Sequence, residues 1–273
     1  MSDPHASRIL TRTTGALLAC AILGGCEKPT AREPFVHLDL ENSTAEASYL
    51  APPSVTGAVA DRTGAVIVTG RAGPKAQVVL STPEGETLHA SANAQGVWTL
   101  SLPQAGHPRL FAISSRQAGR TVHAEGALVT LPHARVAAVM VRAGYAALPI
   151  GTGGHLDIVA VDYDPNGFAG VSGVATPRSP VRLSVDGLPA GVTETDAQGR
   201  FAVLAANRPL SFGSHVLEAA TPGGVVRQTV ELTPPTPLNG PYSASSVPAG
   251  WTGEWALNGG GVQTTLVMAP PHA

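Results

Sequence analysis

The chain has 273 residues and a formal net charge of −2; 13% of its residues are charged and 43% are hydrophobic, and it has 31 Gly and 24 Pro. So much Gly and Pro excludes a helical protein, and the apolar content excludes a disordered chain. The charge excludes a nucleic-acid-binding protein, because too few cations are present to neutralise a run of phosphates. We therefore expect an all-β protein with one large or two small domains and no nucleic-acid partner.

Residues 1–25 are predicted to be a secretory leader. Arg8 and Arg12 give it a positive beginning, and an apolar run follows from residue 15 to residue 25. That run is too short to cross a bilayer as a helix. It ends at Leu-Gly-Gly-Cys, residues 23–26.

This ending resembles the lipobox of bacterial lipoproteins. The resemblance implies that the leader is cut before Cys26 and that the thiolate of Cys26 takes a diacyl lipid. The next residue is Glu27 rather than Asp, and by resemblance to lipoprotein sorting this favours the outer membrane over the inner membrane. The alternative is an ordinary cleaved leader with an unmodified cysteine.

Residues 26–51 lack sustained periodicity and are predicted to be a tether, after which short β-type runs begin. An internal repeat then dominates the sequence. A shift of 103 residues aligns the segment 70–98 with the segment 173–201 without a gap. We therefore expect two domains, at 52–133 and 134–234.

In each copy, apolar residues alternate along predicted strands, and an Asx-Gly turn is followed by an aromatic residue, Trp98 or Phe201. We expect these rings to anchor two cores; the alternative is that they stack on a ligand. Short strands with no helical segment between them are typical of a β-sandwich.

The segment Thr195–Phe201 reads Thr-Asp-Ala-Gln-Gly-Arg-Phe and resembles the strand-turn-strand motif of bacterial Ig-like and carboxypeptidase-regulatory-like modules. Its counterpart Ala92–Trp98 departs by Ala for Thr and Asn for Asp. The resemblance implies an all-β chain with two tandem Ig-like or prealbumin-like β-sandwiches. It implies little about function, because the motif reports a turn geometry.

The C-terminal part is predicted to consist of a Pro-rich linker, 235–250, and a β-hairpin with a tail, 251–273. It holds two of the three tryptophans, Trp251 and Trp255, which share one face of an extended strand. We expect this hairpin to be an interaction element. It would either dock in cis on the second domain or add to the sheet edge of another chain; the alternative is that the tryptophans only cap a sandwich.

Chemical motifs are scarce in the sequence, and no enzyme is expected. Asp162, Asp164 and Asn166 place oxygen atoms at alternate positions before Gly167, as at the beginning of a calcium loop. Gly173 stands where an EF-hand would close with Glu, so an EF-hand is rejected. A looser calcium site and a solvated turn remain the two interpretations, and no other cofactor is expected.

These features together predict a lipid-anchored protein of the bacterial cell envelope that is a non-catalytic structural, adhesion or assembly module. Its expected partners are the membrane, through the lipid, and a protein or an envelope polysaccharide. One alternative is a carbohydrate-binding module for peptidoglycan or exopolysaccharide, which would expose a row of aromatic rings. The other is an accessory subunit of an envelope enzyme complex.

Overall fold

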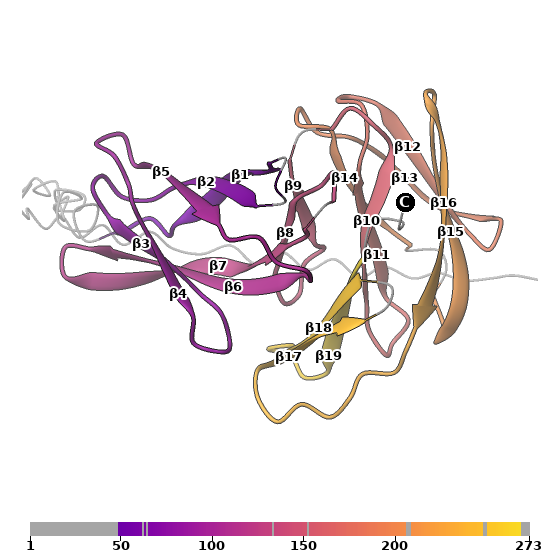
Figure 1. The fold of residues 1–273 in the computed structure, drawn as a ribbon. Helices are drawn as coiled ribbons and strands as arrows, with labels where there is room; N and C mark the ends of the chain where they lie inside the picture. The colour runs from indigo at the N-terminus through magenta and orange to yellow at the C-terminus, as the bar shows by residue number, and fades with distance from the viewer. Residues whose placement is uncertain are drawn as a thin grey trace, which may run out of the picture. The chain divides into compact units, whose positions relative to one another are not determined.

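The computed structural model describes residues 49–268 except 62, 64, 133, 152, 206–208, 248 and 249. The part of the chain from Tyr49 onward forms one compact unit. Every regular element among the described residues is a β-strand (Figure 1). The all-β class predicted from the turn-rich composition is therefore confirmed.

Seven strands form the first sandwich. One of its sheets has the order β1-β2-β5, and the other begins β4-β3-β6-β7, with every neighbouring pair antiparallel. This is the arrangement of an Ig-like sandwich in which the fourth strand pairs with the third rather than with the fifth. The strands are β1 (Ser54–Ala60), β2 (Val66–Arg71), β3 (Gln77–Ser81), β4 (Thr87–Ser91), β5 (Val97–Leu102), β6 (Arg109–Gln117) and β7 (Arg120–Thr130).

The second sandwich repeats this topology, with orders β10-β11-β14 and β13-β12-β15-β16. Both copies have an irregularity at the same place in the first strand pair, between Val55 and Gly57 and between Ile158 and Ala160. The chain therefore contains two tandem Ig-like sandwiches. The strands are β10 (Asp157–Tyr163), β11 (Ala169–Val174), β12 (Pro180–Val185), β13 (Leu188–Glu194), β14 (Arg200–Leu204), β15 (Gly213–Thr221) and β16 (Gly224–Leu232).

The aromatic residue after the turn is buried in both copies, with Trp98 1% and Phe201 4% exposed. Each ring lies over a glycine of the neighbouring strand. A Cβ atom at Gly70 would lie 2.3 Å from the Trp98 ring, and one at Gly173 would lie 2.5 Å from the Phe201 ring. The repeat thus keeps a glycine and an aromatic residue as one packing unit, and the expected role of the rings in the cores is confirmed.

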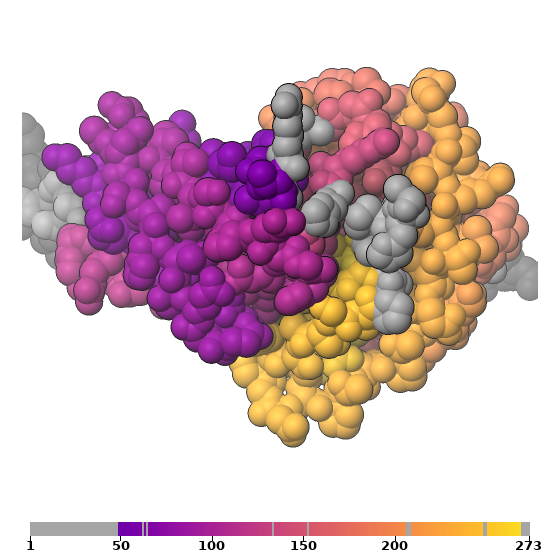
Figure 2. Space-filling view, viewed as in Figure 1, coloured from indigo at the N-terminus to yellow at the C-terminus, as the bar shows by residue number. Residues whose placement is uncertain are grey.

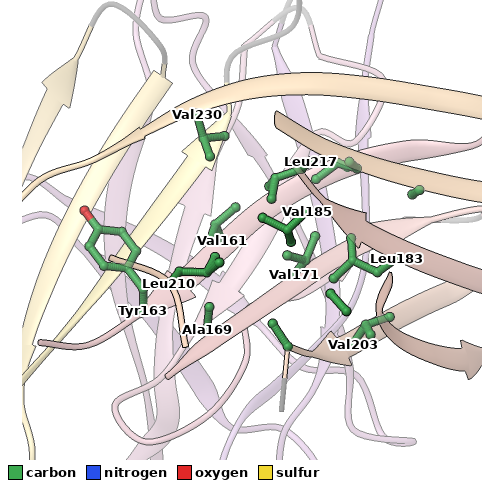
Figure 3. Packing of buried hydrophobic residues seen from close by; sticks show 14 of the residues in the cluster. Val161, Tyr163, Ala169, Val171, Leu183, Val185, Val203, Leu210, Leu217 and Val230 are labelled. Atoms are coloured by element: carbon green, nitrogen blue, oxygen red, sulfur yellow. The ribbon is translucent and has the colours of Figure 1, made fainter. Parts of the chain in front are cut away.

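Each sandwich encloses its own apolar core, built from alternate residues of its two sheets. In the second sandwich, Val161 and Val171 of one sheet pack with Leu183 and Leu217 of the other, and Tyr163 lies at one side (Figure 3). The tandem therefore has two separate cores, one for each copy of the repeat.

Two strands extend the first sandwich beyond the predicted boundary at residue 133. β8 (Ala138–Val141) pairs with β7, and β9 (Leu148–Ile150) pairs with β8. The sequence pattern assigned these residues to the second copy. The structure differs because alternation identifies a strand without identifying the sheet that it joins.

Three strands at the C-terminus extend the second sandwich. They are β17 (Tyr242–Val247), β18 (Gly250–Ala256) and β19 (Val262–Met268), and their sheet has the order β14-β11-β10-β19-β18-β17. The expected two-stranded hairpin is thus a three-stranded addition, because part of the predicted Pro-rich linker forms β17. β19 pairs with β10, so the hairpin docks in cis.

Candidate functional site

A third apolar cluster joins the two sandwiches. It combines residues of β6, β7 and β8 in the first sandwich with residues of β10, β11, β18 and β19 in the second. Trp251 and Trp255, both on β18, lie in this cluster with exposures of 3% and 8%. Its other larger members are Leu110, Val129, Leu131, Val136, Val139, Val141, Val159, Val174 and Val267.

The aromatic rings of the C-terminal strands form a short stack at this junction. Trp255 stacks on Tyr242 of β17, with ring centroids 5.7 Å apart and an interplanar angle of 28°. Trp251 packs against Trp255 in a tilted arrangement, with ring centroids 6.3 Å apart. Tyr242 remains 40% exposed, so this ring connects the buried cluster to the surface.

A buried carboxylate lies beside the apolar cluster. Asp162 on β10 is 1% exposed and accepts three hydrogen bonds. The Ala147 N–H donates to its Oδ2 at 2.7 Å, and its Oδ1 accepts from Thr265 Oγ1 at 2.5 Å and from Gln263 Nε2 at 3.0 Å. The Trp255 indole N–H donates to Thr265 Oγ1 at 3.3 Å, which links the network to the aromatic stack.

Gln263 ties the two sandwiches together through the same network. Its Oε1 accepts from the Gly144 N–H at 2.7 Å, and its Nε2 also donates to the Tyr145 carbonyl at 2.9 Å. Both backbone groups belong to the loop between β8 and β9, whereas Gln263 lies on β19. A buried network with these partners fixes the register of the C-terminal strands against that loop.

Burial raises the pKa of Asp162 from 3.8 to about 6, because desolvation outweighs the hydrogen bonds from Thr265, Ala147 and Gln263. A carboxyl group whose pKa is raised in the folded state stabilises the fold fully below its unfolded pKa. That stabilisation is lost as the pH rises through the folded pKa. Asp162 should therefore lower the free energy of unfolding between about pH 4 and pH 6, by roughly 3 kcal/mol at most.

The variant Asp162→Asn tests this expectation. It cannot ionise, so its free energy of unfolding should vary less with pH than that of the wild type. It should also be less stable, because its amide N–H₂ faces the N–H of Ala147 or one of the two donors on β19. Denaturant unfolding from pH 4 to pH 8 measures both effects. Burial also raises the pKa of Asp157, so the decisive quantity is the difference between the two proteins, and a constant difference would contradict the assignment.

The calcium candidates Asp162, Asp164 and Asn166 have different environments in the structure. Both carboxylate oxygens of Asp162 accept the hydrogen bonds described above. Asp164 caps its own turn, because its Oδ1 accepts from the N–H groups of Asn166 at 2.9 Å and Phe168 at 3.0 Å. No group of three His, Cys, Asp or Glu side chains in the described part of the chain is arranged to hold a metal ion. Calcium binding stays a prediction from the sequence.

Sequence reasoning missed Gln263, Thr265 and Tyr242. A signal existed for the first two: they are polar residues in β19, a strand in which every residue after Val262 is buried. Cys26, the predicted lipid site, lies outside the described residues, and the interaction role of Trp251 and Trp255 stays a prediction.

A surface groove of about 940 Å³ opens next to the aromatic stack. Five consecutive residues of β17, Tyr242–Ser246, form one side, and Trp251 also contributes. The other walls come from the first sandwich, from the β3–β4 loop at 82–86 and from residues 104–110, which lead into β6. The C-terminal strands, at the yellow end of the colour bar in Figure 2, reach the surface of the molecule.

The exposed aromatic rings belong to separate segments. Tyr145 is in the β8–β9 loop, where Arg142 lies 3.4 Å from its ring centroid. The others among the described residues with exposures near or above 40% are Tyr49, Phe168, Phe212 and Tyr242. In the same part of the chain, no apolar helix reaches the length needed to cross a membrane.

No family model and no curated protein matches the chain. Several solved structures do. A biofilm-associated protein BSP domain is 15% identical over 69% of this chain and 30% of that chain, with a TM-score of 0.25. A tetra-tandem repeat from the extending region of a large adhesion protein is 14% identical over 81% and 66%, with a TM-score of 0.21. Invasin, a bacterial integrin-binding protein, is 13% identical over 81% and 55%, with a TM-score of 0.21.

The chain thus spans between 30% and 66% of the length of these three chains. At such identities and TM-scores the similarity carries no inference about function.

Proposed function

We propose that the protein is a non-catalytic structural or adhesion module of the bacterial cell envelope. A lipid on Cys26 anchors it to a membrane, and Glu27 favours the outer membrane over the inner membrane. The tandem sandwiches present a surface to a partner, and the tether at 26–51 sets their distance from the membrane. The leader and the Leu-Gly-Gly-Cys ending support the anchor and the compartment.

The observation that carries the module role is the shared cluster between the sandwiches. The two sandwiches are held together by this cluster, which includes two tryptophans, and by the hydrogen-bond network around Asp162. Such a junction suits a structural spacer, because it restricts motion between the domains. A carbohydrate-binding surface receives less support, since the exposed rings lie on separate segments.

The variant Cys26→Ser tests the anchor. Serine lacks the thiolate that takes the lipid, so labelling with a fatty-acid analogue should be lost, and the protein should become soluble or remain an uncleaved precursor. Membrane fractionation and labelling in whole cells measure this. Cys20→Ser is the matched control, because Cys20 lies inside the leader and its replacement should leave labelling intact. A Cys26→Ser protein that is still labelled and sediments with membranes like the parent would contradict the proposal.

A further inference from the structure

β17 is the last strand of its sheet, and its outer edge is unpaired within the described part of the chain. It carries neither charge nor proline, and its first five residues are exposed. Charged residues and proline usually protect a free strand edge against pairing with another chain. Four other edge strands carry such a residue, namely Pro149 in β9, Glu194 in β13, Arg200 in β14 and Arg227 in β16. The edge strands β1, β4 and β5 resemble β17 in having no Asp, Glu, Lys, Arg or proline, so the groove beside β17 is what distinguishes its edge.

The pairing of β17 with β18 determines which backbone groups face outward. The Ala256 N–H donates to the Pro241 carbonyl at 3.0 Å, so that pair is hydrogen-bonded. Opposite residues alternate between hydrogen-bonded and non-hydrogen-bonded pairs along an antiparallel ladder. Tyr242, Ala244 and Ser246 therefore direct their N–H and C=O groups away from β18, toward the free edge.

This free edge borders the groove of about 940 Å³. Side chains of a strand alternate between its two faces, so five consecutive residues can line one groove only if the edge itself lines it. The walls from the first sandwich face this edge and limit the space beside it. A single extended segment fits such a space better than the edge of a second folded domain.

The charge of the groove favours a basic residue in that segment. Glu86 forms an ion pair with Arg109, and His107 also lines the groove. Glu84 is exposed, and a backbone hydrogen bond lowers its pKa, so it is negative at neutral pH. The β17 side of the groove offers small uncharged side chains and the Tyr242 ring.

We propose that β17 binds an extended segment of a partner polypeptide, uncharged apart from a basic residue, as the next strand of its sheet. Hydrogen bonds to the backbone of Tyr242, Ala244 and Ser246 supply the affinity, and Glu84 and Tyr242 contribute to selectivity. The inference rests on the proposed function and deepens it by naming the chemistry of a partner. Its observations come from the folded residues, so it can fail while the lipid anchor holds.

The test uses phage-displayed random 12-residue peptides selected on the full-length protein in detergent. The best peptide is then measured by fluorescence anisotropy against the wild type, Ala244→Pro and Ala244→Thr. Proline removes an outward N–H and leaves the hydrogen bonds to β18 intact, so it should weaken binding by about tenfold or more. Threonine changes the side chain but keeps the N–H, so the affinity should be largely unchanged.

A second variant, Glu84→Lys, changes an exposed loop residue and does not depend on how the strand tolerates proline. It should weaken binding of the selected peptide severalfold, and the selected sequences should contain Lys or Arg. Failure to enrich any peptide, equal affinity for Ala244→Pro, or indifference to Glu84→Lys would each overturn the proposal. So would a wild-type dimer that Ala244→Pro dissociates in sedimentation velocity, because a second copy would then occupy the edge.

Discussion

Deletion of residues 235–273 should abolish cooperative unfolding of the second sandwich. The deletion removes Trp251 and Trp255 from the apolar cluster that the two sandwiches share. Loss of a buried tryptophan side chain typically lowers the free energy of unfolding by about 3–5 kcal/mol. The deletion also removes Gln263 and Thr265, two of the three donors to Asp162. Together these losses match the entire stability of an ordinary domain, about 5–15 kcal/mol.

Circular dichroism during heating and binding of a hydrophobic dye measure this effect. The truncated protein should melt earlier and without a sharp transition, and it should bind the dye because the β10 edge and the cluster are exposed. Deletion of residues 269–273 alone, which follow β19, is the control and should leave both signals unchanged. Equal melting of the 235–273 deletion and the full chain would show that the C-terminal strands stabilise nothing.

Trp98→Ala and Phe201→Ala should each lower the free energy of unfolding by about 3–5 kcal/mol, because each empties the centre of a core. The two rings belong to different clusters, so the losses should be nearly additive in the double variant. Denaturant midpoints measure both values.

The matched controls lie on the same strands, next to or near the two rings. Val97 is 37% exposed and Leu204 is 52% exposed, so Val97→Ala and Leu204→Ala should change the free energy of unfolding much less. A Trp98→Ala protein with the midpoint of the Val97→Ala protein would contradict the role of the ring in the core. A double variant far from additivity would show that the two cores are energetically coupled.

The repeat was the part of the fold most accessible from the sequence. Gly70 with Trp98 and Gly173 with Phe201 recur at one spacing because each glycine must admit a ring onto its backbone. Residues 138–150 and the C-terminal strands were harder to place. Their alternation predicts strands but does not identify the neighbouring strand. β8 joins the preceding strand β7 rather than the second copy, and β19 pairs with β10, more than a hundred positions earlier.

The junction site could be predicted only in part. The unusual position of Trp251 and Trp255 indicated that this segment packs against something. Asp162 was interpreted as a calcium candidate because alternate oxygen atoms precede a glycine. Its burial depends on β19 and on the β8–β9 loop, which supply all three of its donors, and a local pattern contains no information about such distant donors.

The two sandwiches and the C-terminal strands should unfold as one cooperative unit, because they share one apolar cluster. Differential scanning calorimetry of the Cys26→Ser protein tests this most directly. We expect a single transition with equal calorimetric and van't Hoff enthalpies, because unfolding of either sandwich would expose Trp251, Trp255 and the carboxylate of Asp162. Two separate transitions, each with the enthalpy of one sandwich, would contradict the account.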